Sequence, residues 1–560
     1  MDDRYDVIIA GTGPTGLTLA NILGRHGVRT LVLERDPGLS TFPKALNLDD
    51  EFFRLLHALG LGEAIKAHAK YPISYDYVSP LGLRLAYVEG RYTEHNFPNR
   101  AAIFQPEFER ILAEHALATG QVNIEFDREL VQFTDTGTGV AVVARNAAGE
   151  QFGYSAQYLV GADGAHSACR KLLGLRLDEV DKFDVRHVVI DVLDDIDPSP
   201  MALTKMGWRR NFFSMPAPNG RRFEFSLQPH ETAEQLLDDD TLRRLFKPWR
   251  NYDELKVIRK VVHTFRSRIA PRFQQGRVFL AGDAAHLMPI FGSQGMNSGA
   301  RDANNLGWKL VSVIRYGASP DILATYNEER WGAVLETIRM ATTNGKLQRV
   351  KSIPMSLLRD LVFGMLRLVP PANRYFREMR YIPKPFLRSP LIVPGAERGR
   401  KEEVVGRLLP NPSVVASGQK VLLDDLLGYG FAVVGLGVSA QEAVALRPLA
   451  ERLRANVVVL SSGPHVPAED GSGVAQTAAP DGHITAVQPA VLADDRLAAV
   501  WQQYRGQWLL LRPDRVVAAA GRLDALKRAA SALQEVLQAG PGTGRVNGTA
   551  RDGERARTAA

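Results

Sequence analysis

A glycine-rich turn near the start of the chain constrains the fold more than any other feature. Residues 7–9 are Val-Ile-Ile, a short β-branched run typical of a buried parallel strand. They lead into Gly11-Thr12-Gly13-Pro14-Thr15-Gly16, which is followed by apolar residues at helical spacing. A second strand at 30–33 ends at Glu34. This order of strand, turn, helix, strand and acid predicts a Rossmann-like domain that binds a dinucleotide.

The residue types in this turn have separate physical roles. Gly11 permits the tight turn, Gly13 lets the backbone approach a pyrophosphate, and Gly16 lets the helix pack closely on the strand. Pro14 and Thr15 open the helix, and the N-terminus of that helix would face the phosphates. Glu34 can accept hydrogen bonds from a ribose diol, and we include the adjacent Arg35 in the predicted cofactor site.

The composition excludes several other classes of protein. A length of 560 residues predicts two to four domains, and 45% hydrophobic with 23% charged residues is typical of a globular protein. The net charge of +7 is modest, and no Lys/Arg cluster is interleaved with aromatic residues, so we expect no nucleic-acid partner. The first residues lack a cationic leader, and the uncharged run at 426–441 is too short to span a membrane. We therefore expect a cytoplasmic protein without a membrane partner.

Cysteine and histidine usage argues against redox pairs and metal sites. Cys169 is the only cysteine, so an intrachain disulfide and a CxxC pair are impossible. The chain has no HExxH motif and no evident cluster of His and Asp ligands, so we expect no metal. We interpret His286 as a structural histidine rather than an acid–base catalyst.

Two further segments have the pattern of a strand that ends in a turn with one acid. The segment 281–297 reads AGDAAHLMPIFGSQGMN, in which Asp283 is the only carboxylate among small and apolar residues. The segment 158–174 reads YLVGADGAHSACRKLLG and places Asp163-Gly164 at the end of a strand. Glycines and a single acid favour close approach of the backbone to a ligand.

With the N-terminal turn, these motifs resemble the class A flavoprotein monooxygenases, aromatic hydroxylases that are built around one FAD. The resemblance implies that Asp283, next to Gly282, binds the ribityl chain and that Pro289 lies beside the flavin ring. It implies that the backbone of Gly295, Met296 and Asn297 meets the pyrimidine edge of the flavin. Other cofactor contacts implied by matching positions are Gln105, Asp163 and Lys44, with Lys44 standing where the family usually has arginine.

The same resemblance implies the chemistry. NADH or NADPH is expected as a transient electron donor, because no second GxGxxG follows a strand downstream. O2 is the second substrate, and an oxygenated flavin rather than a side chain carries the reaction, so the catalytic residue is left unknown. A homo-oligomer is left open.

Several segments narrow the resemblance within the family. Residues 42–51, 221–236, 368–385 and 508–521 resemble the branch that acts on 3-(3-hydroxyphenyl)propionate and 3-hydroxycinnamate. The expected reaction is ortho-hydroxylation, which yields 2,3-dihydroxyphenylpropionate from the first substrate. One alternative is hydroxylation of a larger phenolic or polyketide, and an alternative of another class is a non-catalytic FAD-binding protein. Flavin halogenation is disfavoured because the expected Trp-x-Trp motif is absent.

A phenolic acid needs a cation or several donors for its carboxylate. In the strand GRRFEFSL, alternation places Phe223 and Phe225 on one face and Arg222 and Glu224 on the other. We name Arg222, Phe223 and Phe225 as candidate substrate residues. The alternative is a solvated Arg–Glu surface strand, and Lys44 is the other candidate cation.

The expected fold class is α/β, with a Rossmann-like FAD-binding domain that is interrupted by a sheet-containing substrate domain and followed by a small α/β domain. The resemblance implies that this last domain is thioredoxin-like. Helices with apolar spacing are expected over 320–380, including Leu357, Leu361, Met365 and Leu368. The predicted ranges are 1–180 and 276–345 for the FAD-binding domain, 181–275 for the substrate domain, 346–400 for a helical connection, 401–540 for the thioredoxin-like domain without CxxC, and 541–560 for a disordered tail.

Overall fold

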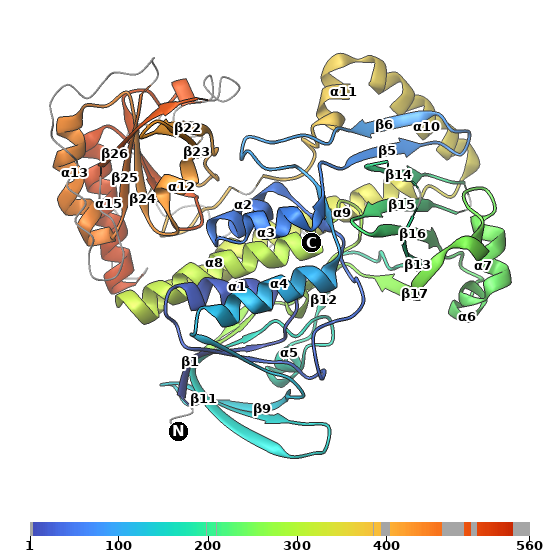
Figure 1. The fold of residues 1–560 in the computed structure, drawn as a ribbon, viewed down its shortest axis with the longest axis horizontal. Helices are drawn as coiled ribbons and strands as arrows, with labels where there is room; N and C mark the ends of the chain where they lie inside the picture. The colour runs from blue at the N-terminus through green and yellow to red at the C-terminus, as the bar shows by residue number, and fades with distance from the viewer. Residues whose placement is uncertain are drawn as a thin grey trace, which may run out of the picture.

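The computed structural model describes residues 4–195, 197, 199–208, 210–384, 386–393, 404–461, 487–493 and 501–540, so the predicted tail lies outside the described residues. The described residues contain three sheets of seven or eight strands, each with its own helices (Figure 1). Among the described residues, no helix is both long enough and apolar enough to cross a bilayer.

The first sheet carries the N-terminal turn. Its strand order is β19-β20-β11-β1-β2-β8, with β10 and β9 continuing from β11, and the β20-β11-β1-β2-β8 pairs are parallel. The strands are β1 (Arg4–Ala10), β2 (Thr30–Leu33), β8 (Val122–Glu125), β9 (Glu129–Asp135), β10 (Val140–Arg145), β11 (Gln151–Gly161), β19 (Gln274–Gln275) and β20 (Val278–Leu280). The surrounding helices are α1 (Pro14–Arg25), α2 (Asp50–Ala58), α3 (Gly62–Ala67), α4 (Gln105–Ala118), α5 (Ala168–Leu172), α8 (Gly295–Tyr316) and α9 (Ala324–Gln348).

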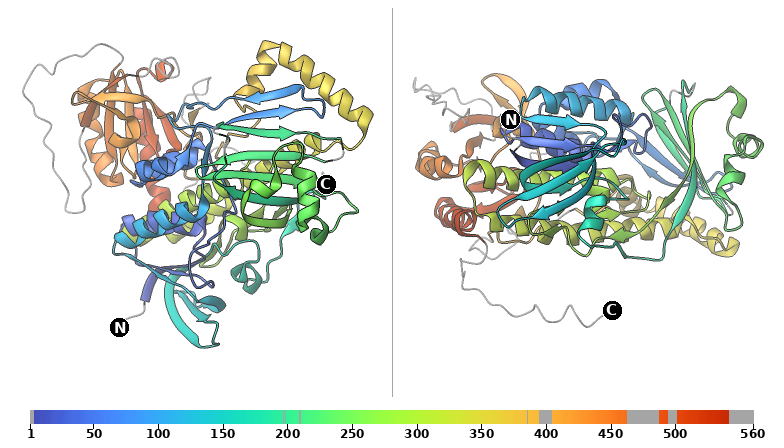
Figure 2. Two further views of the ribbon diagram at one scale, coloured as in Figure 1. Left: turned by 45° about the vertical axis from the view of Figure 1, so that its right-hand side comes forward. Right: turned by 90° about the horizontal axis from the view of Figure 1, so that it is seen from below.

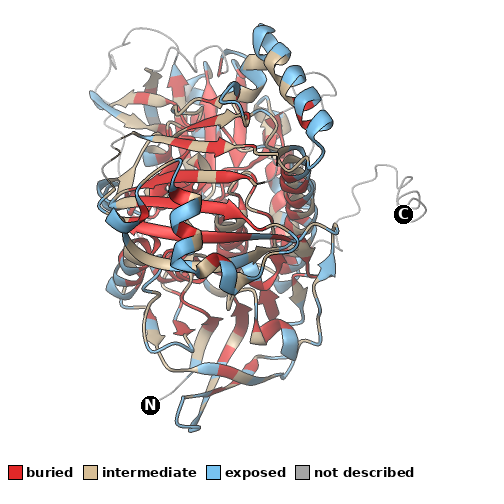
Figure 3. Cartoon of the chain, turned by 90° about the vertical axis from the view of Figure 1, so that its right-hand side faces the viewer, coloured by how far each residue is buried: buried red, intermediate tan, exposed pale blue. Residues whose placement is uncertain are grey.

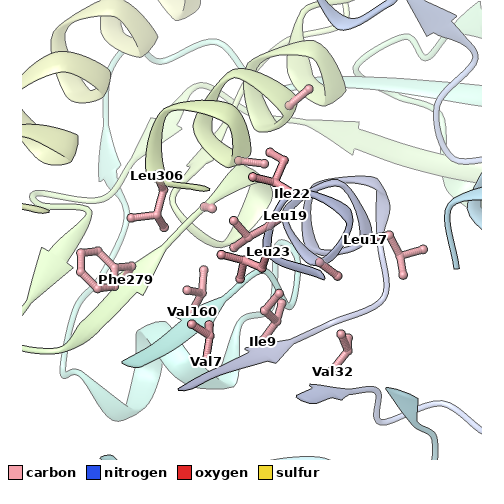
Figure 4. Packing of buried hydrophobic residues seen from close by; sticks show 14 of the residues in the cluster. Val7, Ile9, Leu17, Leu19, Ile22, Leu23, Val32, Val160, Phe279 and Leu306 are labelled. Carbon is pink, nitrogen blue, oxygen red and sulfur yellow. The ribbon is translucent and has the colours of Figure 1, made fainter. Parts of the chain in front are cut away.

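The core of this domain explains the apolar patterns at its start. Leu19 and Leu23 of α1 lie over the strands that carry Ile9 and Val160 (Figure 4). Their side chains are buried, and burial of one such side chain contributes about 1.5–3 kcal/mol. On its other side, α1 packs closely on α8, because a Cβ at Gly307 would lie 2.8 Å from Ile22.

In the part of the chain that the structure describes, two three-stranded sheets and three short 3-10 helices complete this region and its connections. One small sheet contains β3 (Asn47–Leu48), β7 (Ala101–Ile103) and β4 (Ala69–Lys70), and the other β12 (Asp178–Glu179), β18 (Arg268–Ile269) and β21 (His286–Leu287). The 3-10 helices are η1 (Tyr252–Glu254), η2 (Gly282–Ala284) and η3 (Pro320–Leu323).

The second large sheet corresponds to the predicted substrate domain, and its order is β17-β13-β16-β15-β14-β5-β6. Its strands are β5 (Ser74–Val78), β6 (Arg84–Val88), β13 (Val185–Leu193), β14 (Met201–Lys205), β15 (Phe212–Ala217), β16 (Gly220–Ser226) and β17 (Lys256–Phe265). The predicted range 181–275 therefore omits two strands, because β5 pairs in parallel with β14 across more than a hundred residues of chain. Helices α6 (Ala233–Leu237) and α7 (Asp239–Phe246) lie on the outer face of this sheet, whereas α10 (Ile353–Leu368) and α11 (Pro370–Arg377) lie beside β6 (Figure 2).

The third sheet forms the C-terminal domain, with the order β23-β22-β26-β25-β24-β27-β28. Its elements are β22 (Ser413–Ala416), β23 (Gln419–Leu422), α12 (Leu423–Leu427), β24 (Ala432–Leu436), α13 (Ala440–Leu453), β25 (Asn456–Ser461), β26 (Val487–Leu492), β27 (Gln507–Leu511), β28 (Val517–Gly521) and α15 (Leu523–Ala539).

Buried charges attach the C-terminal domain to the first domain. Arg512 donates to Glu329 of α9 at 2.7 and 2.8 Å, and Lys309 of α8 donates to the same carboxylate at 3.0 Å. All three side chains are fully buried. Removing one member of such a buried network costs about 3–5 kcal/mol, so the two domains are firmly joined.

Candidate functional site

The first turn has the geometry that a pyrophosphate requires. Gly11 has φ +107°, and a Cβ there would lie 2.5 Å from the carbonyl oxygen of Ala162. A Cβ at Gly16 would lie 2.1 Å from the Gly11 carbonyl oxygen, whereas a Cβ at Gly13 would meet nothing within 4 Å. Helix α1 begins at Pro14 with no side-chain cap and no acid in its first turn. Its free N–H groups and positive end therefore suit an anionic ligand that approaches over Gly13.

Glu34 is held at the end of β2 by the turn itself. Its Oε2 accepts hydrogen bonds from the amide of Thr12 at 2.9 Å and from the Thr12 hydroxyl at 2.7 Å. Its Oε1 accepts from the amide of Asp36 at 3.0 Å. Arg35 is exposed and lies 3.7 Å from Asp36. This arrangement orients the Glu34 carboxylate beside the first turn, where a ribose would lie.

The three motifs meet at one edge of the first sheet. Strands β1, β11 and β20 are parallel neighbours, so their carboxyl ends carry Gly11, Asp163 and Gly282 side by side. A Cβ at Gly282 would lie 2.6 Å from the Thr15 hydroxyl, which shows that the third motif touches the first turn of α1. The fold thus assembles one site from segments that lie far apart in the sequence.

Asp163 supplies an unsatisfied acceptor at this edge. Its Oδ2 accepts from the amide of Cys169 at 3.0 Å, but its Oδ1 is buried and has no hydrogen-bond partner among the described residues. Such atoms are rare in folded proteins and mark places where a ligand or water donates. Cys169 itself is fully buried in the core.

Asp283 is accessible although its neighbours are not. Gly282 and Ala284 are buried, whereas the Asp283 side chain is exposed. Desolvation by the surrounding protein raises the pKa of Asp283, and the charges of His286 and Lys44 oppose that rise. An accessible carboxylate in dense surroundings suits an acceptor for the hydroxyl groups of a polyol such as ribityl.

A buried network beneath the third motif was missed by the sequence reasoning. Asp302 accepts from the amide of Gly282 at 3.0 Å, from His286 Nε2 at 2.8 Å and from Arg330 Nε at 2.7 Å. Arg170 donates to the Ala284 carbonyl at 2.8 Å and so joins the second and third motifs. The sequence feature that could have indicated this network is Asp302, the single acid in the otherwise uncharged helical stretch 302–308.

The loop 289–297 is anchored around the N-terminus of α8. Pro289 is buried, and α8 begins at Gly295, next to Met296, without a side-chain cap or an acid in its first turn. The Asn297 side chain accepts from the amide of Asp49 at 3.0 Å and donates to the carbonyl of Ser293 at 2.9 Å. The loop therefore presents backbone donors, and its positive helix end suits the electron-rich pyrimidine edge of a flavin.

The side chain of Gln105 contacts the backbone that carries Lys44. Gln105 Oε1 accepts from the amides of Lys44 and Ala45 at 2.9 and 2.5 Å, and its Nε2 donates to Glu109 at 2.6 Å. Burial raises the pKa of Glu109 to about 7. The Lys44 side chain is exposed. Gln105 thus shapes the segment that carries Lys44.

Arg222 is neither a free guanidinium nor a solvated side chain. It is buried and forms a two-pronged pair with Asp191 at 2.7 and 3.0 Å, while its Nη atoms donate to the carbonyls of Lys44 and Pro43 at 3.0 and 2.6 Å. Four hydrogen bonds occupy most of its five donor hydrogens. This placement corrects the expectation that Arg222 binds a substrate carboxylate: it attaches the 43–44 segment to the substrate sheet.

The two phenylalanines point to the opposite side of the sheet. Phe223 and Phe225 pack edge-on against Phe246 of α7 with ring centroids 5.1 and 5.2 Å apart. Both belong to a hydrophobic cluster under α6 and α7. This placement corrects the expectation that they line the substrate pocket, because those helices lie on the outer face of the sheet.

A different cation lies where the loop 289–297 meets the substrate sheet. Arg100 is buried and donates to the carbonyls of Asn99 at 2.8 Å and Gly292 at 3.4 Å. In the described part of the chain it forms no ion pair within 4 Å, although its charge acts on the nearby carboxyl groups of Asp49 and Asp50 and lowers the pKa of each. Burial raises the pKa values of Tyr75, to about 12, and of Tyr77 and Tyr381, whereas the Arg100 charge lowers all three. The arginine thus lies near three phenol groups at the junction of the two domains.

Comparison with known proteins agrees with this geometry. Residues 4–341 match a family model described as FAD binding domain, and residues 406–536 match one described as HcaD C-terminal domain. A relative from Escherichia coli O81 (strain ED1a), 3-(3-hydroxy-phenyl)propionate/3-hydroxycinnamic acid hydroxylase, is 33% identical over 96% of this chain and 95% of its own.

Solved structures of similar fold cover the whole architecture. The flavin-dependent monooxygenase PieE, solved with FAD and substrate, has a TM-score of 0.74 at 21% identity and covers 96% of this chain and 99% of its own. OxyS anhydrotetracycline hydroxylase from Streptomyces rimosus has a TM-score of 0.71 at 26% identity, with the same coverage of both chains.

Proposed function

We propose that this chain, which belongs to the FAD-binding monooxygenase family, uses NADH or NADPH and O2 to hydroxylate a small phenolic acid ortho to its hydroxyl group. Membership of the family makes the chain an FAD-dependent hydroxylase, and the proposal concerns its substrate. When bound, FAD supplies the redox chemistry and the activation of oxygen. Gly13 and the α1 N-terminus would hold the pyrophosphate, Glu34 the ribose, Asp163 and Asp283 further hydroxyl groups of the cofactor, and the loop 289–297 the ring.

The residues around the ring would orient the phenol and exclude water from it. The loop 289–297 carries no charged side chain, and its first residue, Pro289, is buried. Phe291 of the loop lies edge-on to His187 of β13, with ring centroids 6.5 Å apart, so the loop contacts the substrate sheet. An uncharged lining of this kind would limit the access of water to the bound cofactor.

The finer proposal is that the substrate is 3-(3-hydroxyphenyl)propionate, with 3-hydroxycinnamate as a second substrate. The relative of that name supports it, and so does Arg100. A buried arginine whose printed hydrogen bonds go only to neutral carbonyls has unused donors, which a carboxylate would satisfy in two-pronged geometry. Tyr75 and Tyr77, both on β5, would form the wall beside it.

The test compares an acid with its neutral analogue. In Arg100→Met, KM for 3-(3-hydroxyphenyl)propionate is expected to rise about ten- to a hundredfold, the scale of one lost charge-assisted hydrogen bond. KM for 3-propylphenol, which has the same chain length without the carboxylate, is expected to change little. Arg186→Met is the control, because Arg186 is exposed on β13 of the same sheet. Equal effects of Arg100→Met on both phenols would remove Arg100 from the carboxylate site without affecting the reaction class.

A second candidate is hydroxylation of a larger phenolic or polyketide, which the 26% identity to an anhydrotetracycline hydroxylase favours. Phenol-stimulated oxidation of NADH and of NADPH, with product identified, distinguishes the candidates across a panel of phenolic acids and tetracyclic phenols. A chain that binds FAD but shows no stimulation with any phenol would instead be a non-catalytic FAD-binding protein.

The C-terminal domain is proposed to be thioredoxin-like in architecture and to serve assembly or stability. Three parallel strands, β24, β25 and β26, continue into the antiparallel pair β27 and β28, which supports a mixed α/β fold of this kind. The C-terminal domain has no CxxC pair for redox chemistry, because Cys169 is the only cysteine and lies in the first domain.

A further inference from the structure

The inner face of the substrate sheet contacts two segments of the cofactor site. Strands β13 and β16 are buried along most of their length (Figure 3), so both faces of the sheet are covered there. Asp191 of β13 pairs with Arg222, which donates to the carbonyls of residues 43–44. Four residues earlier on the same face of β13, His187 lies edge-on to Phe291. The two contacts are about 13 Å apart along the strand, so the sheet between them faces the space between the two segments.

A buried histidine and a buried glutamate form a pair on this inner face. The Nδ1 atom of His187 lies 3.0 Å from the Oε2 atom of Glu224 on β16, and the two residues are 3% and 4% exposed. An ionised carboxylate has no hydrogen to donate, so Nδ1 carries the imidazole proton and donates to Glu224. The other ring nitrogen, Nε2, is therefore left as an acceptor.

This acceptor is unsatisfied. The Nε2 atom of His187 is buried and has no hydrogen-bond partner among the described residues. The neighbouring rings of Phe265 and Phe291, at 5.7 and 6.5 Å between centroids, cannot donate to it. A histidine that served only to join β13 to β16 would need no second polar contact, whereas an unpaired buried nitrogen marks a place where a ligand or water donates. His187 thus offers one oriented acceptor beside the loop 289–297.

We propose that His187 is the catalytic base that takes the phenolic proton of the substrate, and that Glu224 is a positioning residue that holds the imidazole in the required tautomer. This inference rests on the proposed function, because it requires a phenol beside the loop 289–297. In the step, the phenolic O–H bond breaks, the proton bonds to Nε2, and the electron pair stays on the oxygen of the resulting phenolate. The Glu224 carboxylate offsets the positive charge of the imidazolium.

Removal of this proton activates the carbon that is hydroxylated. A phenolate places negative charge on its ortho and para carbons, which makes them better nucleophiles than those of a neutral phenol. The oxygen atom comes from O2 and the electrons from NADH or NADPH, as in the proposed function. When the ring becomes aromatic again, the hydrogen of the ortho carbon is released as a proton and the imidazolium returns its proton to the phenol oxygen. His187 is then neutral for the next turnover.

The other charges on this face are paired or solvated. Besides Glu224, the charged and titratable side chains that face His187 from β13, β16 and β17 are Asp191, Arg222, Arg259 and His263. Both arginines pair with the aspartate, at 2.7 and 3.4 Å. His263, the cross-strand neighbour of His187, is exposed, and the loop 289–297 carries no charge. In the described part of the chain, Glu224 is thus the ionisable group to which the imidazole is hydrogen bonded.

Two phenols of different acidity test the proposal. With 3-(3-hydroxyphenyl)propionate, kcat of His187→Gln should fall about 100- to 1000-fold, within the range that a general base contributes. The second substrate is 3-(2,3,4-trifluoro-5-hydroxyphenyl)propionate, which leaves the carbon between the hydroxyl group and the side chain free. Assayed above the pKa of this phenol, wild type and variant should differ by less than about threefold, because the substrate is already ionised and needs no base. FAD affinity shows that each variant is folded.

The pH dependence of kcat is the readout that a structural role would not change. Without the base, the unfluorinated phenol must ionise by itself, so kcat of His187→Gln should rise with pH toward the pKa of a phenol, about 10. The wild type should reach its full rate at a lower pH. Glu224→Gln should lower kcat about tenfold on the unfluorinated phenol, because the imidazolium loses its counter-charge. His263→Gln is the matched control and should keep the wild-type profile, since His263 is an exposed histidine on the adjacent strand.

The outcomes separate this inference from the proposed function. Equal losses of kcat on both phenols, or a pH profile of His187→Gln with the wild-type shape, would overturn the role of His187 while leaving the hydroxylase activity in place. If His187→Gln does not retain FAD, the same comparison of the two phenols is made with Glu224→Gln, and an equal loss on both would again overturn the role. A wild type that hydroxylates neither phenol would overturn the proposed substrate and this role with it.

Discussion

Replacing Asp302 with asparagine should uncouple the third motif from the core beneath it. Asp302 is fully buried and accepts from Gly282, His286 and Arg330 at 2.7–3.0 Å. Asparagine keeps the shape, but its amide has one acceptor oxygen instead of two and brings two donor hydrogens that face existing donors. The Arg330 guanidinium would then be buried without a counter-charge. Such a loss costs about 3–5 kcal/mol in the free energy of unfolding.

The pH dependence of stability follows from the same contacts. Burial raises the pKa of Asp302, but Arg330 and His286 lower it by more, so its pKa in the folded protein is below the ordinary value. A carboxyl with a lowered pKa stabilises the fold fully above its unfolded pKa of about 4 and loses that contribution as the pH falls through the folded pKa. The wild type should therefore lose more stability than Asp302→Asn on acidification below about pH 4.

Urea unfolding of the apoprotein and fluorescence titration with FAD are the two assays. Asp240→Asn is the matched control, because Asp240 forms an ion pair with Arg243 at 2.6 Å but is 80% exposed, and such pairs contribute about 0–1 kcal/mol. Asp302→Asn should also raise the Kd for FAD about tenfold or more, because Gly282 would lose its anchor. Equal urea midpoints for the two variants would refute the ion-pair reasoning. Lower stability with unchanged FAD affinity would refute the positioning of the third motif by Asp302.

Two further substitutions probe the cofactor directly. Asp283→Ala should weaken FAD retention by about 1–3 kcal/mol, since a ribityl hydroxyl would lose its acceptor, and equilibrium dialysis with unchanged FAD affinity would contradict the assignment. Glu34→Ala should lower FAD affinity in the same titration and leave turnover per bound FAD intact; normal binding together with loss of hydroxylation would mean that Glu34 acts on the reaction instead.

A local sequence pattern was sufficient to predict a feature when the residues of one segment determine that feature by themselves. Gly11 and Gly16 are required sterically, because a Cβ at either position would collide with a backbone carbonyl oxygen. The family match over residues 4–341 confirms the predicted FAD-binding class. The 33% identity over 96% of the chain likewise confirms the resemblance to the hydroxylases of phenolic acids. These features depend on residues adjacent in sequence, so a single reading of the chain could find them.

Features that depend on which element covers a given face were decided only by the tertiary structure. Strand alternation correctly separated Phe223 and Phe225 from Arg222, but it could not show that α6 and α7 cover the phenylalanines while Asp191 neutralises the arginine. The sequence did not identify Arg100 and Asp302, because their surroundings are formed by segments that lie far apart in the chain.

Helix α10 most clearly separates what the sequence predicts from what the tertiary structure decides. The spacing of Leu357, Leu361, Met365 and Leu368 predicted a helix with an apolar face, and the structure contains that helix. Periodicity states which side chains share a face, because that is set by the 3.6-residue turn, but not what the face contacts. The contact was decided by Arg359 and Ser356, whose bonds to backbone carbonyls hold the polar side inward and leave the apolar side exposed.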